Sequence, residues 1–217
     1  MKTLVTMVAT GVLSCSLMAV SPAPVLAAEK ASPQAKESKN RRVKRTQTLS
    51  QQVYKRLEAI NELVTNENYG EAIEDLQSLE DRRLNSYEKA LVLNTRALIY
   101  ISQEDSAKAI KTYKQMTALE DIPDSLEQGA LYNLAGLHMR NEDFAKALVP
   151  LNKWFDLVEK PSATAYVLRA QAYFQLEKFN KALPDIKAAI ADFKKRGKKP
   201  RENWLVIEGR IYHHSKD

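Results

Sequence analysis

Hydrophobic positions recur with a helical period over residues 131–154, LYNLAGLHMRNEDFAKALVPLNKW, and a polar turn at 140–143 interrupts them once. The apolar faces before and after this turn are formed by Leu131, Leu134, Ala135, His138, Ala147 and Leu151. Side chains three or four positions apart share one face of an α-helix, so this spacing predicts two amphipathic helices. Small residues at Ala135 and Ala147 would let the two helix backbones approach closely.

The same pattern occurs four times between residue 49 and residue 195. Each second helix opens on a similar tetrad, GEAI, AKAI, AKAL or NKAL, and the alanines of these tetrads are Ala72, Ala109, Ala147 and Ala182. The steps between these alanines are 37, 38 and 35 residues. A regular period of this kind indicates stacked helical pairs, each in contact only with its neighbours. Because β-branched alternation is rare, the predicted fold class is all-α.

Two helix starts carry the three-residue spacing of a capping box. Asn85 is followed by Glu88, and Asp124 is followed by Glu127. In such a box the first side chain accepts from the backbone of the fourth residue, whose own side chain accepts from the first. We therefore predict a capping box before the second helical pair and another before the third.

A ninth helix is predicted after the fourth pair. It follows the basic loop 194–199 and carries Trp204 and Ile211 at inward positions. It is either a cap that covers the fourth pair or the first half of a further unit. Both alternatives bury the same two side chains.

The beginning of the chain has the organisation of a signal peptide. Lys2 is followed by the uncharged apolar run 4–20, and small residues then lead to Ala27. We expect cleavage near Ala27 and a periplasmic location. A membrane anchor and lipidation at Cys15 are the alternatives. Since Cys15 is the only cysteine, cleavage would leave no thiol for a disulfide, a metal site or catalysis.

Residues 28–47 are predicted to be a basic disordered linker. They hold seven basic and two acidic residues and lack a helical period. The segment is either a solvated tail or a weak attachment to an anionic membrane surface or an acidic partner. The predicted folded domain, residues 48–217, holds 25 basic and 25 acidic residues and is neutral. A nucleic-acid partner is not expected, because it would require basic residues clustered on the fold.

Taken together, these helical pairs resemble the tetratricopeptide repeat family over roughly residues 49–214. The resemblance implies an α-solenoid of about four helix–turn–helix units with a capping helix at its C-terminal end. Arg96 and Arg169 depart from the family pattern, because they occupy positions usually given to a large apolar residue.

The resemblance also implies a concave groove, lined by the first helix of each unit, that binds a peptide or protein segment. The groove residues are predicted to be Tyr54, Asn61, Asn94, Leu98, Tyr132, Met139, Arg140, Gln171, Phe174 and Tyr212. Aromatic rings offer a large contact area, and amides can bond to an extended backbone. Gly129 and Gly136 would leave room for a ligand beside Tyr132. Alternatively, several of these side chains fill gaps between adjacent first helices.

A narrower resemblance concerns the last part of the chain. The sequence Pro-x-Glu-Asn-Trp at 200–204, then Tyr212 and the pair 216–217, is similar to periplasmic repeat proteins of TonB-type energy-transduction systems. That resemblance implies a place in an envelope transport complex, with subunits of such a system as partners.

The sequence contains no recognisable catalytic constellation. His138 is expected to be a packed core ring. His213 and His214 point about 100° apart on a helix and are not predicted to bind a metal. There is no Gly-rich phosphate loop and no HExxH motif. We therefore expect a non-enzymatic periplasmic adaptor or scaffold without a cofactor. The alternatives are an assembly factor of another envelope complex and an exported enzyme whose site no motif marks.

Overall fold

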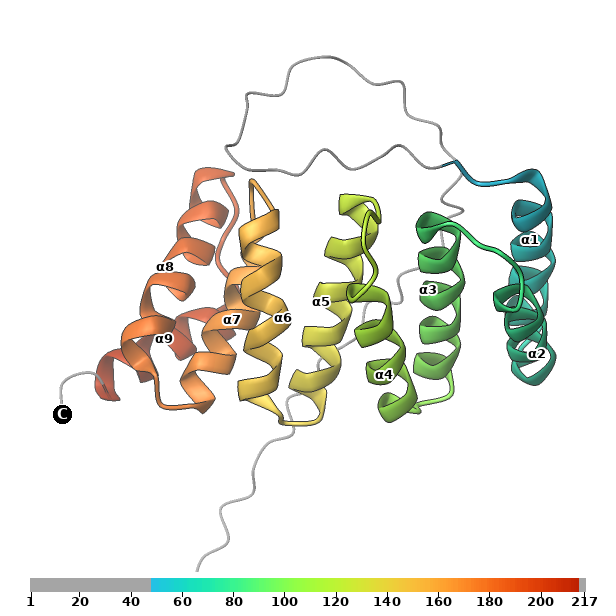
Figure 1. The fold of residues 1–217 in the computed structure, drawn as a ribbon. Helices are drawn as coiled ribbons and strands as arrows, with labels where there is room; N and C mark the ends of the chain where they lie inside the picture. Colours follow the sequence, from blue (N-terminus) through green and yellow to red (C-terminus); the bar gives the residue numbers. More distant parts are fainter. Residues whose placement is uncertain (1–47, 215–217) are drawn as a thin grey trace, which may run out of the picture. The chain divides into compact units, whose positions relative to one another are not determined.

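The computed structural model describes residues 48–214, which form a row of helices that follow one another in chain order (Figure 1). The predictions for residues 1–27, 28–47 and 215–217 lie outside the described residues. The helices are α1 (Gln51–Thr65), α2 (Tyr69–Glu80), α3 (Ser86–Ser102), α4 (Ser106–Thr117), α5 (Asp124–Arg140), α6 (Phe144–Leu157), α7 (Ala163–Gln175), α8 (Phe179–Lys195) and α9 (Glu202–His214). Since residues 48–214 contain helices and no strand, the predicted all-α class is confirmed.

Successive helices pair into the four predicted units. Unit one is α1 with α2, unit two is α3 with α4, unit three is α5 with α6, and unit four is α7 with α8. Each second helix also packs against the first helix of the next unit, and α9 packs against α8. This pattern of neighbour contacts is that of a helical solenoid.

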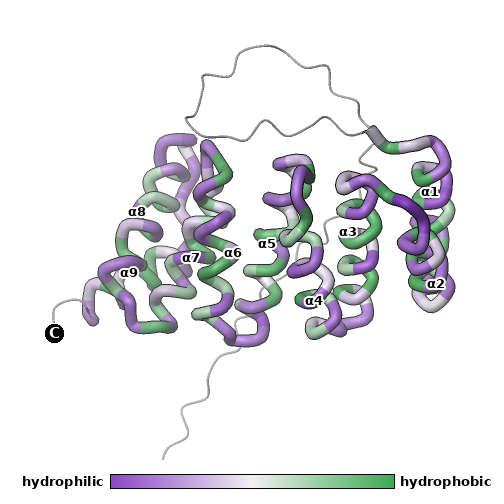
Figure 2. Tube along the Cα trace, viewed as in Figure 1, coloured by the Kyte–Doolittle hydropathy of each residue, from purple (hydrophilic) through white to green (hydrophobic). Residues whose placement is uncertain are grey.

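The core follows the pattern of apolar positions. In Figure 2, hydrophobic and hydrophilic stretches alternate along the helices, as amphipathic helices require. The four repeat alanines, Ala72, Ala109, Ala147 and Ala182, are all fully buried. The buried side chains form three clusters, centred on unit one, on unit two with α5, and on unit four with α9.

The turn inside each unit repeats one backbone conformation. Its central residue has a positive φ and is a glutamate every time: Glu67, Glu104, Glu142 and Glu177. The next amide then bonds back into the first helix, as Asp143 N does to the His138 carbonyl at 2.9 Å. These bonds satisfy carbonyls that a helix end would leave without a partner. The turn predicted at residues 140–143 is thus observed in all four units.

The capping box predicted at Asn85 is confirmed, and Glu88 does more than cap its own helix. The Asn85 side chain accepts from the Glu88 amide, and the Glu88 carboxylate accepts from the Asn85 amide. The same buried carboxylate accepts from Ser50 N at 2.9 Å. Burial tends to raise the pKa of Glu88, but the hydrogen bonds from Ser50 and Asn85 lower it overall. Glu88 therefore ties the start of α1 to the start of α3.

The capping box predicted at Asp124 is wrong. Helix α5 begins at Asp124 itself, and its N-cap is Pro123, which makes no side-chain capping bond. Pro123, with a ψ of 142°, takes the N-cap position itself, so Asp124 is the first helical residue and lies one position too late to cap.

Two prolines lie inside second helices. Pro150 is in the middle of α6, and Pro184 is in the second turn of α8. Each proline removes one backbone hydrogen bond from its helix, yet both helices continue for at least another turn. Packing of the apolar faces on both sides of each proline offsets that loss.

The C-terminal helix is held as predicted. Trp204 and Ile211 are buried, and the Trp204 ring packs edge-to-face on Phe193 of α8 with centroids 4.6 Å apart. No helix within residues 48–214 combines the length and the apolar composition needed to cross a bilayer.

Candidate functional site

The first helices present a shared surface to solvent. Helix α1 contacts α3, α3 contacts α5, and α7 contacts α9. We define the first-helix surface as the ten predicted residues: Tyr54, Asn61, Asn94, Leu98, Tyr132, Met139, Arg140, Gln171, Phe174 and Tyr212. Pairs of these residues on one helix are three, four or seven positions apart and so share a helical face, as Asn94 and Leu98 do on α3; Arg140 directly follows Met139, and Tyr212 lies on α9. None of the ten is fully buried.

The middle of this surface is open and mostly uncharged. Leu98 on α3 is 43% exposed, although it is a large apolar side chain. Asn61 and Arg140 are exposed, and Asn94 is partly buried. A Cβ atom added at Gly136 would meet no atom within 4 Å. Apolar, amide and open positions therefore alternate here, as they do on surfaces that bind an extended backbone.

Tyr132 is not an isolated anchor, because it begins a row of aromatic rings. Its ring lies 5.3 Å from Trp154, Trp154 lies 5.4 Å from Phe155, and Phe155 lies 5.1 Å from Tyr166. The row joins α5, α6 and α7, and all four rings are partly exposed. Trp154, Phe155 and Tyr166 were not predicted as surface residues. No sequence pattern marks them, because a helical period does not say which side chains meet across different helices.

An arginine of α7 lies at the same junction and pairs with an aspartate of α8. Arg169 donates to both oxygens of Asp185, with each bond 2.7 Å long, and its guanidinium carbon lies 3.5 Å from the Phe155 ring centre. Its remaining nitrogen faces the Asn152 side chain at 3.5 Å. Burial opposes the charge of Arg169, but the bonds to Asp185 outweigh it and raise the pKa of Arg169. Arg169 thus occupies a largely buried position because its charge is paired with Asp185 and its guanidinium stacks on Phe155.

Arg96, the other departure from the apolar pattern, is also paired. It forms an ion pair with Glu80 of α2 at 2.8 Å, and both side chains are largely buried. At these two positions the family usually has a large apolar residue that packs against the next helix. Here Arg96 and Arg169 link neighbouring helices by ion pairs instead.

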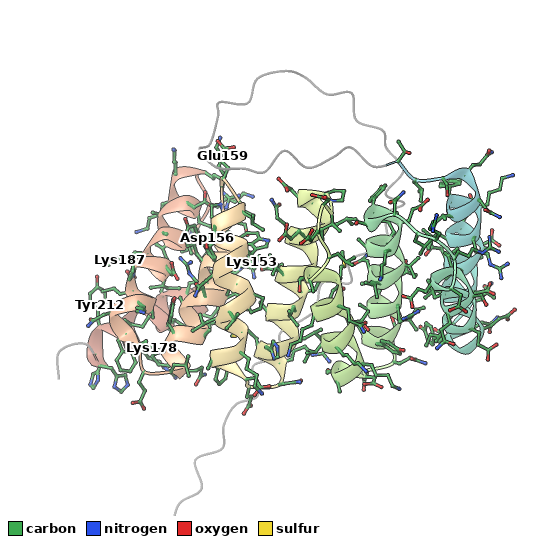
Figure 3. All side chains as sticks on the ribbon, in the orientation of Figure 1. Lys153, Asp156, Glu159, Lys178, Lys187 and Tyr212 are labelled. Atoms are coloured by element: carbon green, nitrogen blue, oxygen red, sulfur yellow. The ribbon has the colours of Figure 1, made fainter. Side chains whose placement is uncertain are left out.

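Phe174 and Tyr212 lie apart from the row, where α7, α8 and α9 meet. The Phe174 ring lies 5.6 Å from Phe179 and 6.3 Å from His214. The Lys187 ammonium lies over the Tyr212 ring, 5.1 Å from its centre, and Figure 3 shows the two side chains close together. Bonding to Tyr212 raises the pKa of Lys187. Both aromatic residues thus also stabilise the contact of α9 with its neighbours.

Beneath the surface, a buried phenol joins unit two to unit three. Tyr113 of α4 is fully buried, and its hydroxyl accepts from the Asn133 side chain of α5 at 2.9 Å. Burial raises the pKa of Tyr113 to about 12, although the bond from Asn133 opposes this. Asn133 is exposed, but its side chain is engaged by the Tyr113 hydroxyl.

The chemistry of the described residues is that of a packed scaffold. His138 is buried, as expected for a core ring, and its Nδ1 atom lies 3.6 Å from Asp143. Residues 48–214 contain no group of three or more ligands able to hold a metal. On the outer side, an open hollow of about 480 Å³ follows α4 beside Ile110 and Lys114. Asp156, near the end of α6, and Glu159, just after that helix, are exposed (Figure 3).

Comparisons with known families match this architecture. A profile of the tetratricopeptide repeat matches residues 57–121 and 94–154, and a second profile of the same repeat matches residues 163–193. Together the matches span 98 and 31 of the 217 residues, which is more than half of the chain. No curated protein matches the chain.

Solved structures show the same fold at low sequence identity. The crystal structure of kinesin light chain repeats from Podosopora anserina is 16% identical with a TM-score of 0.55, and the match covers 76% of this chain and 87% of that one. A tetratricopeptide repeat protein from Parabacteroides merdae is 17% identical, with a TM-score of 0.52 over 76% of this chain and 59% of its own. The MamA RS-1 ArsTM double mutant is 13% identical, with a TM-score of 0.56 over 78% and 97%.

Proposed function

Because this chain belongs to the tetratricopeptide repeat proteins, we propose that it binds a segment of another protein through its first-helix surface. Repeats of this family are protein-interaction modules, and their solenoids present extended concave surfaces to partners. The proposed ligand is an extended or helical segment with apolar side chains. The chain acts as an adaptor or scaffold in this proposal and catalyses no reaction.

The observation that carries the proposal is the open centre of the first-helix surface. Leu98 is exposed there among amide side chains, and Gly136 leaves free space on the neighbouring helix. An apolar partner side chain would bury the Leu98 surface, and Asn94 and Gln171 would bond to the partner backbone. Arg140 is the only charged residue among the ten predicted contacts, so the segment bound at the centre would be neutral or weakly acidic.

The proposed location is the periplasm, and the proposed setting is an envelope complex of the TonB type. The signal-like segment 1–27 and the similarity of residues 200–204 to periplasmic repeat proteins support these two points. An assembly role in another envelope complex is the alternative. Cell fractionation with mass spectrometry of the mature N-terminus tests the location. A chain retained in the cytoplasm with residues 1–27 intact would contradict it.

The binding proposal is tested with a blocking substitution and its matched control. Gly136→Phe places a ring on the first-helix surface, and Gly70→Phe places the same ring on the second helix α2. Neither glycine has an atom within 4 Å of an added Cβ, so neither substitution clashes at the first side-chain atom. Crosslinked partners are captured in cells from each variant and identified by mass spectrometry.

We expect wild type and Gly70→Phe to capture the same partner in similar amounts. Gly136→Phe should capture at least about tenfold less of that partner. Capture of energy-transduction subunits with this pattern would support the TonB setting. Capture of other envelope proteins would support the adaptor function but contradict a role in a TonB-type complex. Equal capture by both variants would show that the first-helix surface is not the binding site.

A further inference from the structure

The turn between α8 and α9 concentrates positive charge in a domain that is otherwise balanced. Residues 194–201, KKRGKKPR, hold six basic residues and no acidic residue, whereas residues 48–217 as a whole hold 25 of each. We name residues 194–201 the basic turn. Every residue of the turn except Pro200 is exposed. A local excess of this size creates a positive field that the rest of the domain does not cancel.

The basic turn has a defined conformation. Gly197 takes a φ of +67°, which an L side chain rarely adopts, and the Lys198 amide then bonds to the Phe193 carbonyl at 2.9 Å. This bond closes the end of α8 and fixes the direction in which the following residues leave it. The turn is therefore a presented surface with a set geometry.

The arginines and the lysines of the turn have different surroundings. Arg196 lies over the Phe193 ring at 4.9 Å and pairs with Asp192, and Arg201 lies over the Trp204 ring at 5.7 Å. The four lysines, in contrast, make no ion pair with any residue described in 48–214: Lys194, Lys195, Lys198 and Lys199. The arginines thus pack on the turn's aromatic base, and the lysines remain available to an external anion.

Exposed aliphatic side chains follow the basic turn directly. Leu205 is 46% exposed and Val206 is 47% exposed, both in the first turns of α9. Exposed aliphatics beside unpaired lysines are the combination that peripheral membrane segments use. The lysines attract anionic headgroups, and the aliphatic side chains enter the interface.

We propose that the basic turn, together with Leu205 and Val206, docks this domain on an anionic lipid bilayer. The aromatic residues beside the turn argue against a nucleic acid, because single-strand binding uses exposed rings that stack on bases. Here Trp204 is buried against Phe193 and both rings are covered by arginines. An exposed turn also matches a flat surface better than the cleft that an acidic peptide would need. The proposal is independent of the binding function proposed for the first-helix surface.

The test measures partition of the full chain onto vesicles of phosphatidylglycerol and phosphatidylcholine in equal parts, against vesicles of phosphatidylcholine alone. The turn variant is Lys198→Glu with Lys199→Glu. Its matched control is Lys55→Glu with Lys89→Glu, which makes the same charge change on exposed residues of α1 and α3. All variants keep residues 1–47 unchanged, so any contribution of that segment is equal in each. A third variant, Leu205→Ser with Val206→Ser, keeps the charge.

We expect the wild type to prefer anionic vesicles at about 50 mM salt and to lose this preference at about 1 M, where the screening length is short. The turn variant should bind about tenfold or more weakly, the charge control within about twofold of wild type, and the aliphatic variant several-fold more weakly. Amides of residues 198–206 should gain protection from hydrogen exchange on anionic vesicles only.

Three results would overturn the proposal. The first is equal vesicle binding by the turn variant and the charge control. The second is unchanged exchange at residues 198–206 while the chain is bound. The third is binding to a single-stranded oligonucleotide that the turn variant loses, without binding to vesicles, which would assign the turn to a nucleic acid.

Discussion

At the scale of single residues, His138 links the packing of unit three to pH. Burial, followed by the positive charge of Lys114, lowers the pKa of His138 below 6.5, and Asp143 opposes this only in part. The folded chain keeps the imidazole neutral, whereas the unfolded chain takes up a proton as the pH falls through 6.5. The contribution to stability is therefore complete above pH 6.5 and is lost as the pH falls toward the lower folded pKa.

We predict that the free energy of unfolding falls by up to about 1.4 kcal/mol per pH unit within this window. Urea unfolding at about pH 7.5 and about pH 5.5 measures the change for wild type and for His138→Phe. The phenyl ring keeps an aromatic side chain at the buried position and cannot be protonated, so the variant should lose most of the difference. Parallel pH profiles for the two proteins would mean that His138 is not the group responsible.

At the scale of elements, the Arg169–Asp185 pair holds α7 to α8. Both side chains are largely buried, and the pair is bidentate. Removing the charge of Asp185 leaves a buried guanidinium without its counter-charge, which costs more than the net value of the pair. We predict that Asp185→Asn lowers the free energy of unfolding by about 2–3 kcal/mol.

Asp75 provides the matched control for this prediction. It bonds to Arg56 at 2.6 Å on the corresponding part of α2, but that pair is exposed to solvent. Asp75→Asn should therefore cost about 0.5 kcal/mol or less. Chemical unfolding of both variants makes the comparison. Similar losses at the two sites would show that the burial of the Arg169 pair contributes nothing specific.

The elements could be predicted from the sequence, but the side-chain contacts between helices could not. Four alanines at a regular period were enough to place eight helices, because the repeat imposes the same packing in each unit. The aromatic row at Trp154 and the pairing of Arg169 could not be derived. Those partners lie on different helices, and a periodic pattern does not say which side chains meet across them. Pro184 is a further example. A proline inside a helix is expected to break or kink it, but packing keeps α8 continuous through this residue.

At the scale of the whole domain, the three separate hydrophobic clusters indicate that its ends are coupled only through their neighbours. Ile60 belongs to the cluster of unit one, and Trp204 belongs to the cluster of unit four with α9. In a solenoid, stability is approximately a sum of units and nearest-neighbour interfaces. Damage at one end should then open that end first, and the other end should stay folded.

We predict that Trp204→Ala removes hydrogen-exchange protection from α7, α8 and α9, while α1 and α2 stay close to wild type. Ile60→Ala should do the reverse, and each substitution should cost about 3–4 kcal/mol locally, because both side chains are at least 98% buried. The two variants act as controls for each other, because each removes a buried side chain at the opposite end of the domain. If either variant lowered protection evenly from α1 to α9, the domain would unfold as one cooperative unit. The aromatic row between α5 and α7 would then be the element that transmits the coupling.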